Sequence, residues 1–230
     1  MLFRQFVDED LGCASYLVGD EAAGEAVLVD PAYAIEQYLE ETRRTGVRIV
    51  RVLETHTHAD HVSGHGRLAL EHGLPVSIHA AARAEYPHDG LADGDELEVG
   101  SVTVRCLHTP GHRPEHCAFL AGSSLMTGDS LFCGSVARPD LAVEAREGAE
   151  GLFHSLHRLL ELPDDVQVFP GHVAGSLCGT GMRSDPSSTI GAERRGNALL
   201  AIATVYEFVD DATGAPSPRP PNMERIVELN

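Results

Sequence analysis

The sequence predicts an α/β (α+β) fold, in which helices flank β-sheets. Short apolar, β-branched runs alternate with stretches of helical periodicity along most of the 230 residues. His and Asp residues follow several of the predicted strands directly, where those strands end. Sites in sheet-based folds lie on loops at strand ends, so this second pattern predicts a functional site at one edge of a sheet.

The apolar runs predict strands, in chain order, at LFRQFV (2–7), ASYLV (14–18), EAVLVD (25–30), RIVRVLE (48–54), PVSIHA (75–80), ELEVGSVTVRCLHT (96–109), HCAFLAG (116–122), SSLMTGD (123–129) and VQVFPGH (166–172). The continuous β-branched run at 48–54 is typical of a strand that is buried on both faces. Helices are expected at 34–44, 63–72, 148–162 and 193–209. Ser63 is the expected N-cap of the second helix. One catalytic domain should span 1–210, followed by a linker-like tail at 211–230 that contains ATGAPSPRPPN (212–222).

Composition excludes several classes of partner. The formal net charge is −18 and all 17 basic residues are Arg, so nucleic acid and anionic membranes are unfavourable partners. No apolar run is long enough for a transmembrane helix, and the N-terminus lacks a signal-peptide pattern. The five cysteines are widely spaced without a CxxC pair, which argues against a disulfide framework and favours the cytoplasm.

Four of the strand ends deliver metal-binding side chains. The stretch ETHTHADHVSG (54–64) follows a predicted strand, and TPGH (109–112), TGD (127–129) and PGH (170–172) follow three others. Together they supply seven candidate ligands: His56, His58, Asp60, His61, His112, Asp129 and His172. Zinc normally takes about four ligands, so seven fit either a two-metal site with a shared carboxylate or one metal with surrounding residues that orient its ligands. We expect the other histidines to be ordinary surface or core residues, namely His65, His72, His79, His88, His108, His116, His154 and His157.

The motifs THTHADH, TPGH, TGD and PGH, in this order, resemble the metallo-β-lactamase superfamily over roughly residues 10 to 205. The resemblance implies an αββα sandwich of two mixed β-sheets flanked by helices, with metal at one edge. Within the superfamily, TGDSLFCGSVARPDL (127–141), LPDDVQVFPGHVAGSLCG (162–179) and STIGAERRGN (188–197) look like bacterial persulfide dioxygenases, especially the branch fused to a rhodanese domain. One departure is the stretch 135–137, where many relatives have another glycine before the Arg.

That resemblance implies one Fe(II) per chain, held by His56, His112 and Asp129 with positions open for O₂ and substrate. The implied reaction oxidises glutathione persulfide, or a similar small persulfide, to sulfite and thiol. His58, Asp60, His61 and His172 would orient ligands and water, and Asp60 is also a candidate catalytic residue. The alternative is a binuclear hydrolase of the glyoxalase II or lactonase type, with two Zn(II) and these same residues holding the second metal. A non-enzymatic metal-dependent sensor is the third hypothesis.

Three further residues are candidates for substrate binding. Arg138 either pairs with Asp140 or meets a glutathione carboxylate. Ser176 is expected to line the pocket, and Cys178 either carries persulfide sulfur or is an inert thiol. The segment PRPPNMERIVELN (218–230) resembles the linker that precedes a rhodanese domain, which suggests a rhodanese sulfurtransferase partner. A homodimer is expected, because relatives are often dimers.

Overall fold

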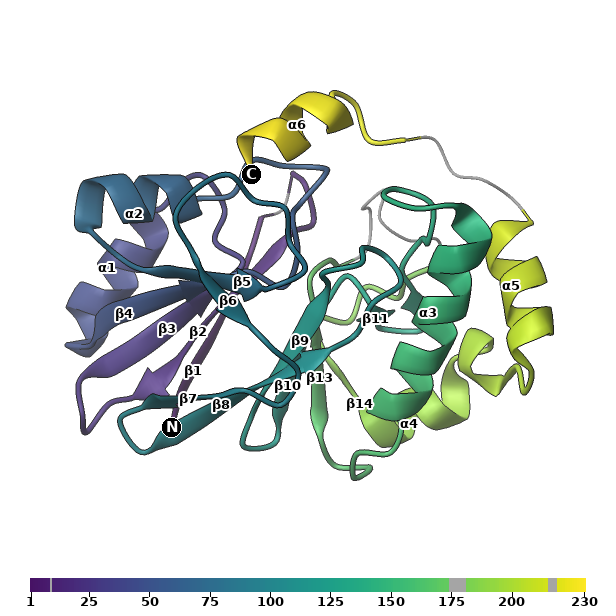
Figure 1. Ribbon diagram of the computed structural model, residues 1–230. Coiled ribbons are helices and arrows are strands. Elements are labelled where there is room, and N and C mark those ends of the chain that lie inside the picture. Colours follow the sequence, from purple (N-terminus) through teal and green to yellow (C-terminus); the bar gives the residue numbers. More distant parts are fainter. Residues whose placement is uncertain (9, 174–180, 215–218) are drawn as a thin grey trace.

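The computed structural model describes residues 1–8, 10–173, 181–214 and 219–230, and it contains two six-stranded sheets (Figure 1). The first sheet has the order β1-β2-β3-β4-β5-β6. Its strands are β1 (Leu2–Val7), β2 (Ala14–Asp20), β3 (Glu25–Val29), β4 (Arg48–Leu53), β5 (Val76–His79) and β6 (Asp89–Leu91). The pairs β1–β2 and β2–β3 are antiparallel and the other three pairs are parallel, so the sheet is mixed.

The second sheet has the order β14-β13-β10-β9-β8-β7 and is also mixed, because only β10 and β13 pair in parallel. Its strands are β7 (Glu96–Val99), β8 (Val102–His108), β9 (Cys117–Ala121), β10 (Ser124–Gly128), β13 (Gln167–Pro170) and β14 (Ser188–Thr189). A small hairpin of β11 (Leu131–Phe132) and β12 (Ser135–Val136) follows β10.

Helices cover the outer face of each sheet (Figure 1). The helices are α1 (Glu36–Thr45), α2 (His65–His72), α3 (Ala145–Leu159), α4 (Ile190–Gly196), α5 (Val205–Thr213) and α6 (Met223–Leu229). Tyr38 of α1 and Leu68 of α2 pack with Leu28 and Val52 of the first sheet. Leu152 and Leu156 of α3 lie at helical spacing, and they pack with Leu125 of the second sheet and Phe208 of α5.

The main core lies between the two sheets. Alternation along the strands sends Val27 and Val29 inward, where they join Phe119 and Met126 of the second sheet, while Leu28 faces outward toward the helices. In β4, Leu53 faces the inner core and Val52 the outer one, which accounts for the continuous apolar run in the sequence. The predicted αββα sandwich is confirmed.

Two local predictions were wrong. The expected helix at 193–209 is divided into α4, a 3₁₀ turn at Leu199–Ala201 and α5. It breaks at Asn197, whose backbone is extended and whose side chain donates to the carbonyl of Ser135 and to Glu193. The second helix begins at His65 with Gly64 as its N-cap. Ser63 lies one residue before the cap: its oxygen accepts from the amide of His65 at 3.2 Å, and its single proton faces Glu54 at 2.7 Å and the carbonyl of Pro31 at 3.1 Å.

The predicted tail contains α6, which lies at the upper edge of the molecule in Figure 1. The expected division between residues 210 and 211 falls inside α5, and as a domain boundary it stays a prediction. Asn230 follows α6 and is buried against the loop after β4.

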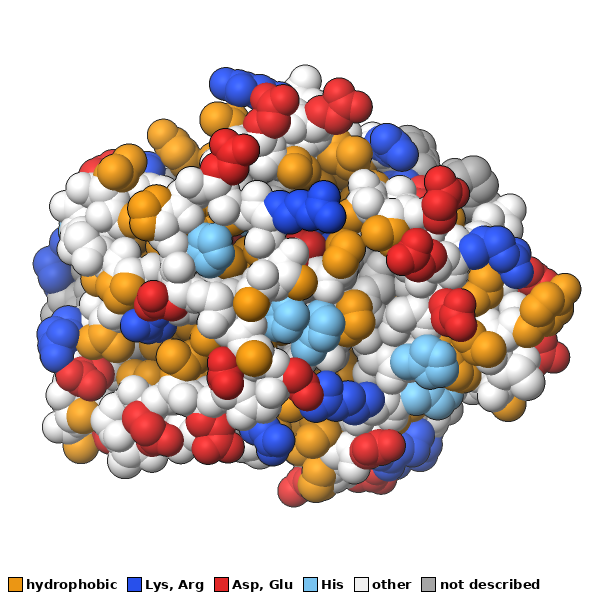
Figure 2. Space-filling view, viewed as in Figure 1, with side chains coloured by type: hydrophobic (Ala, Val, Ile, Leu, Met, Phe, Trp, Pro, Cys, Tyr) orange, Lys and Arg blue, Asp and Glu red, His pale blue; other side chains and the backbone are white. Residues whose placement is uncertain are grey.

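No helix within the described ranges is long and apolar enough to cross a membrane. Figure 2 shows acidic and Arg side chains interspersed over one face, without a broad basic area on that face. This distribution fits the acidic composition.

Candidate metal centre

The loops that follow β4, β8, β10 and β13 converge at one edge of the sandwich. Together with Cys13, which precedes β2, and Asp30, which follows β3, their side chains form three groups. Within each group, the potential ligand atoms all lie within 4.8 Å of one another. The first group contains His56, His112 and Asp129. The second contains Cys13, Asp60, His61 and His172, and the third contains Asp30, Glu54 and His58. The structure therefore brings together all seven candidates that the sequence singled out, and it adds three residues to them.

In the first group, two imidazoles face one carboxylate. The Nε2 atoms of His56 and His112 lie 4.0 Å and 3.7 Å from Oδ2 of Asp129. All three side chains are buried. Among the described residues, neither Nε2 of His56 nor Oδ2 of Asp129 has a hydrogen-bond partner. Buried polar atoms without partners are costly, and a cation among these three atoms would satisfy them. The donor set of the first group therefore fits a metal.

The far side of each ligand in the first group is fixed by a hydrogen bond. The hydroxyl of Thr55 donates to Asp30, so its oxygen accepts from Nδ1 of His56 at 2.9 Å. Nδ1 of His112 donates to the carbonyl of Arg138 at 2.9 Å. Both bonds select the tautomer that leaves Nε2 free as a ligand. Oδ1 of Asp129 accepts from Nδ1 of His172 at 2.7 Å, so only Oδ2 faces the two imidazoles.

The protonation of the first group also suits a metal. Burial and the neighbouring histidines hold the pKa of His56 well below its usual value, and burial also lowers the pKa of His112. Burial raises the pKa of Asp129, but the charge and hydrogen bond of His172 outweigh it and lower the pKa to about 2. Neutral imidazoles and an ionised carboxylate are the forms that bind metals.

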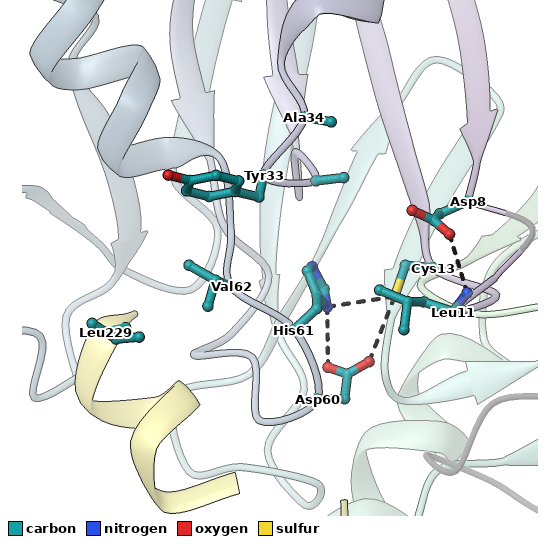
Figure 3. A pocket seen from close by; sticks show the side chains of 10 residues that line it. Asp8, Leu11, Cys13, Tyr33, Ala34, Asp60, His61, Val62 and Leu229 are labelled. Carbon is teal, nitrogen blue, oxygen red and sulfur yellow. Dashed lines mark hydrogen bonds and ion pairs between the residues drawn. The ribbon is translucent and has the colours of Figure 1, made fainter. Parts of the chain in front are cut away.

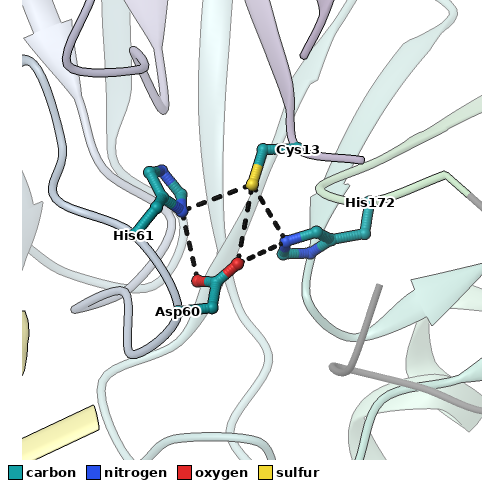
Figure 4. A group of neighbouring side chains, drawn as sticks. All are labelled: Cys13, Asp60, His61 and His172. Atoms are coloured by element: carbon teal, nitrogen blue, oxygen red, sulfur yellow. Dashed lines mark hydrogen bonds and ion pairs between the residues drawn. The ribbon is translucent and has the colours of Figure 1, made fainter. Parts of the chain in front are cut away.

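The second group surrounds the thiol of Cys13 (Figure 4). Its Sγ lies 3.5 Å from Oδ2 of Asp60, 3.4 Å from Nδ1 of His61 and 3.3 Å from Nε2 of His172. Burial and the nearby His58 lower the pKa of His61, but hydrogen bonds to Asp60 and Cys13 raise it to about 9. His172 belongs to this group through Nε2 and touches the first group through Nδ1.

In the third group, Nε2 of His58 faces two acids, while its Nδ1 is buried without a partner among the described residues, and its ring centroid lies 4.3 Å from that of His56. Nε2 of His58 lies 3.1 Å from Oε2 of Glu54 and 3.4 Å from Oδ1 of Asp30. Burial lowers the pKa of His58, but hydrogen bonds to the two acids outweigh it and raise the pKa well above its usual value. His58 is therefore an ion-pair partner of two buried carboxylates in this structure.

Two glycines allow the loops to approach so closely. A Cβ at Gly128 would lie 2.6 Å from Oγ1 of Thr55 and 2.8 Å from Nε2 of His116, and its φ of 49° is left-handed. A Cβ at Gly171 would lie 2.5 Å from Oδ1 of Asp129. A side chain at either position would displace a residue of the centre.

Arg138 forms a bidentate ion pair with Asp140, at 2.7 Å and 2.8 Å, which was one of its two predicted roles. Ser176 and Cys178 lie outside the described residues.

Sequence reasoning missed Cys13, Asp30 and Glu54, and it treated His116 as an ordinary core residue. The ring centroid of His116 lies 5.2 Å from that of His56, and Nε2 of His116 is buried without a partner in the described chain. Asp30 and Glu54 each end a predicted strand, the same signal that identified Asp129, whereas the position of Cys13 carried no such signal.

Comparison with known proteins places this centre in a family. The model of the metallo-beta-lactamase superfamily matches residues 8–172, and the chain belongs to that superfamily. The mitochondrial persulfide dioxygenase ETHE1 of Bos taurus is 30% identical over the whole chain, which covers 87% of that protein. The crystal structure of ETHE1 from Myxococcus xanthus superposes with a TM-score of 0.89 at 30% identity, covering 99% of this chain and 96% of that one. A hydroxyacylglutathione hydrolase of Gloeobacter violaceus is 38% identical over 68% of this chain and 62% of its own length.

The chain is thus an enzyme of the metallo-β-lactamase superfamily with persulfide dioxygenases among its homologues. The resemblance to persulfide dioxygenases and glyoxalase II that the motifs predict is confirmed.

Proposed function

We propose that the protein is a non-haem Fe(II) persulfide dioxygenase that converts glutathione persulfide, or a similar small persulfide, to sulfite and thiol. The balanced reaction takes a persulfide anion, O₂ and water to thiolate, sulfite and two protons. Similarity to persulfide dioxygenases over nearly the full chain supports this reaction. One Fe(II) per chain would be held by His56, His112 and Asp129.

The observation that carries the proposal is the donor set of the first group, which consists of the two imidazoles of His56 and His112 and the carboxylate of Asp129. Nε2 of His58 lies instead with Glu54 and Asp30. This set matches the 2-His-1-carboxylate triad of non-haem iron oxygenases, which leaves open positions for O₂ and substrate. A binuclear zinc enzyme would draw on His58 as a further ligand.

When bound, Fe(II) would supply sites at which O₂ and the soft persulfide sulfur lie side by side. The residues of this chain would then orient the reactants. Burial of the first group keeps bulk water away from the reacting sulfur. Asp60 lies beside the centre and accepts a hydrogen bond from His172 at 2.8 Å. The Asp60 carboxylate can take a proton from the water that enters the product.

Other predictions remain proposals about the substrate and its partners. Arg138, whose carbonyl accepts from His112, would position the thiol carrier. Ser176 and Cys178 would line the substrate pocket. A rhodanese sulfurtransferase would exchange sulfur with the enzyme, and the active form would be a homodimer in the cytoplasm. Size-exclusion chromatography with light scattering tests the dimer.

Oxygen consumption tests the reaction. Iron-reconstituted protein is mixed with glutathione persulfide in an oxygen electrode, and sulfite is measured at the end. We expect rapid O₂ uptake with one sulfite formed per O₂. Absence of uptake with iron bound would contradict the proposal.

The second candidate is a binuclear zinc hydrolase, which the 38% identity to a hydroxyacylglutathione hydrolase favours. Asp60, His61 and His172 would hold the second zinc, and Asp129 would bridge the two metals. Hydrolysis of S-lactoylglutathione by the zinc-loaded protein, with two zinc per chain, would support this function over the dioxygenase.

A further inference from the structure

A cavity with an apolar mouth opens beside the metal centre (Figure 3). Its volume is about 670 Å³, which is ordinary for a small-molecule site. Its mouth carries Leu11, Tyr33 and Leu229, which are all exposed. Its floor is formed by Cys13 and His61, which are buried. A small molecule that fills the cavity would therefore touch apolar side chains outside and polar side chains inside.

The charges around this cavity are mainly negative. The carboxylates of Asp8 and Asp60 line it, and none of its described lining residues is Arg. Arg67 lies over the ring of Tyr33, at 5.5 Å from the ring centroid, but it is already paired with two glutamates of α1 and α2. Nδ1 of His61 lies 3.1 Å from Oδ1 of Asp60. A carboxylate inside the cavity would thus meet like charges without a free guanidinium to balance it.

We infer that this cavity selects persulfides whose organic part carries no carboxylate, so that uncharged carriers bind better than glutathione. This inference rests on the proposed dioxygenase activity and specifies its substrate class. Glutathione carries more carboxylates than ammonium groups, so Asp8 and Asp60 would repel it. An uncharged carrier avoids this repulsion and buries apolar surface against Leu11, Tyr33 and Leu229.

The floor of the cavity is joined to the first group through His172. Oδ2 of Asp60 accepts from Nε2 of His172 at 2.8 Å, and Nδ1 of the same ring donates to Oδ1 of Asp129 at 2.7 Å. The sulfur end of the carrier would lie at the floor, toward the proposed iron ligands, and the organic part would fill the mouth. Contacts at the mouth act equally on the bound substrate and on the transition state, so they change KM more than kcat.

A second cavity is the rival place for a carboxylate. It has a volume of about 920 Å³, and its lining includes Arg83 and Arg113. Nε of Arg113 is paired with Glu115 at 2.6 Å, whereas Arg83 has no ion-pair partner among the described residues. No described residue of the three groups lines this second cavity. The first cavity, which Asp60 and His61 line, is therefore the better place for a reacting persulfide.

A matched pair of carriers tests the inference. N-acetylcysteine and its methyl ester differ in a single carboxylate. Iron-loaded protein is titrated with each thiol in an anaerobic calorimeter, and O₂ uptake is measured with each persulfide. We expect the ester to bind at least about 10-fold more tightly, and its persulfide to have a KM at least about 10-fold lower at a similar kcat.

The two measurements separate this inference from the proposed function. Equal binding of the two thiols, tighter binding of the acid, or binding of neither would overturn the inference. Tighter binding of the ester without turnover of either persulfide would support the selectivity of the cavity and contradict the dioxygenase.

Variants assign the preference to the cavity. Leu11→Arg adds a guanidinium at an exposed turn position and should lower the KM for the acid persulfide about 10-fold. Asp8→Asn keeps an oxygen for the amides of that turn and should narrow the difference between acid and ester. Leu70→Arg places the same guanidinium on an exposed position of α2 outside the cavity and should leave the preference unchanged. An unchanged preference in both Leu11→Arg and Asp8→Asn, or a higher KM for the acid persulfide in Arg83→Ala, would overturn the assignment.

Discussion

At the scale of single residues, the hydrogen bonds behind each ligand decide which atom can reach a metal. His112 has its Nδ1 bound to the carbonyl of Arg138, so Nε2 alone can serve as a ligand. His112→Ala removes one of only three proposed iron ligands. We expect loss of most of the bound iron and a fall of about 100-fold or more in oxygen uptake. Elemental analysis and the oxygen electrode measure the two effects.

His154→Ala is the matched control for His112→Ala, because His154 lies exposed on α3 and contacts no group of the centre. It should keep both iron and activity. Full iron content in His112→Ala would show that the ligand set is wrong.

His172 makes a different prediction, since it touches Asp129 without belonging to the first group. His172→Ala should keep most of the iron while activity falls about 10- to 100-fold, because Oδ1 of Asp129 loses its donor. His172→Asn places an amide N–H near the position of Nδ1 and should recover part of the activity. Iron content and the rate of oxygen uptake separate the two effects. Loss of iron in His172→Ala would favour the binuclear site.

At the scale of secondary-structure elements, α6 is attached to the centre by one side chain. The amide of Asn230 donates to the carbonyls of His58 and His61, at 3.0 Å and 2.8 Å, and accepts from the N–H of Ser63 at 2.8 Å. These three bonds hold the backbone of the loop that carries His56, His58, Asp60 and His61.

Asn230→Ala should release both α6 and this loop. The change leaves the two carbonyls and the amide without their partners, at a cost of about 1–3 kcal/mol in the free energy of local opening. Hydrogen exchange of the amides in 56–64 and 223–229 should accelerate, while exchange in β9 and β10 stays slow. Glu228→Ala, which changes an exposed residue of α6 two positions before Asn230, is the control. Unchanged exchange in 56–64 would show that Asn230 does not hold the loop.

The same scale shows what the sequence could predict. Strands such as β3 and β4 were located to within a residue or two because each is a short apolar run between turn residues. The run at 96–109 is divided into β7 and β8, and the short strands β6, β11, β12 and β14 were not predicted. The helix at 193–209 was wrong because its break depends on the carbonyl of Ser135, which is distant in the sequence. Cys13 was missed for a similar reason, since only the bridge to His172 brings it to the centre. Ligands at strand ends follow from local pattern, whereas contacts between distant loops need the fold.

At the scale of the whole molecule, titration of buried histidines should limit stability on both sides of neutrality. In the metal-free protein, burial lowers the pKa of His116 to about 3, aided by the charge of His112. An unfolded chain binds a proton at this residue below its ordinary value of about 6.5. Stability should therefore fall as pH decreases from about 6.5 toward 3, because the unfolded state then holds more protons.

The titration of His61 has the opposite effect on stability, which it lowers as the pH rises. Burial opposes its protonation, but Asp60 and Cys13 raise its pKa to about 9 in the folded state. Its contribution is fully present below about pH 6.5 and is lost as pH rises through 9, because only the folded state keeps the proton in that window. The chelator-treated protein should thus be most stable near pH 6.5. Urea unfolding midpoints, measured from about pH 5 to 9, should decline on both sides.

Variants separate the two limbs of this profile. His116→Gln cannot be protonated, so it should make the acid limb less steep and leave the alkaline limb in place, while the lowered pKa values of His56 and His112 keep part of the acid limb. His154→Gln changes an exposed histidine and should keep both limbs. If the urea unfolding midpoint of the unaltered protein stays constant between about pH 6.5 and 5, His116 is not buried in its neutral form. Zinc added to the chelated protein should oppose the alkaline loss, because the cation would replace the proton on His61 and bind only the folded state.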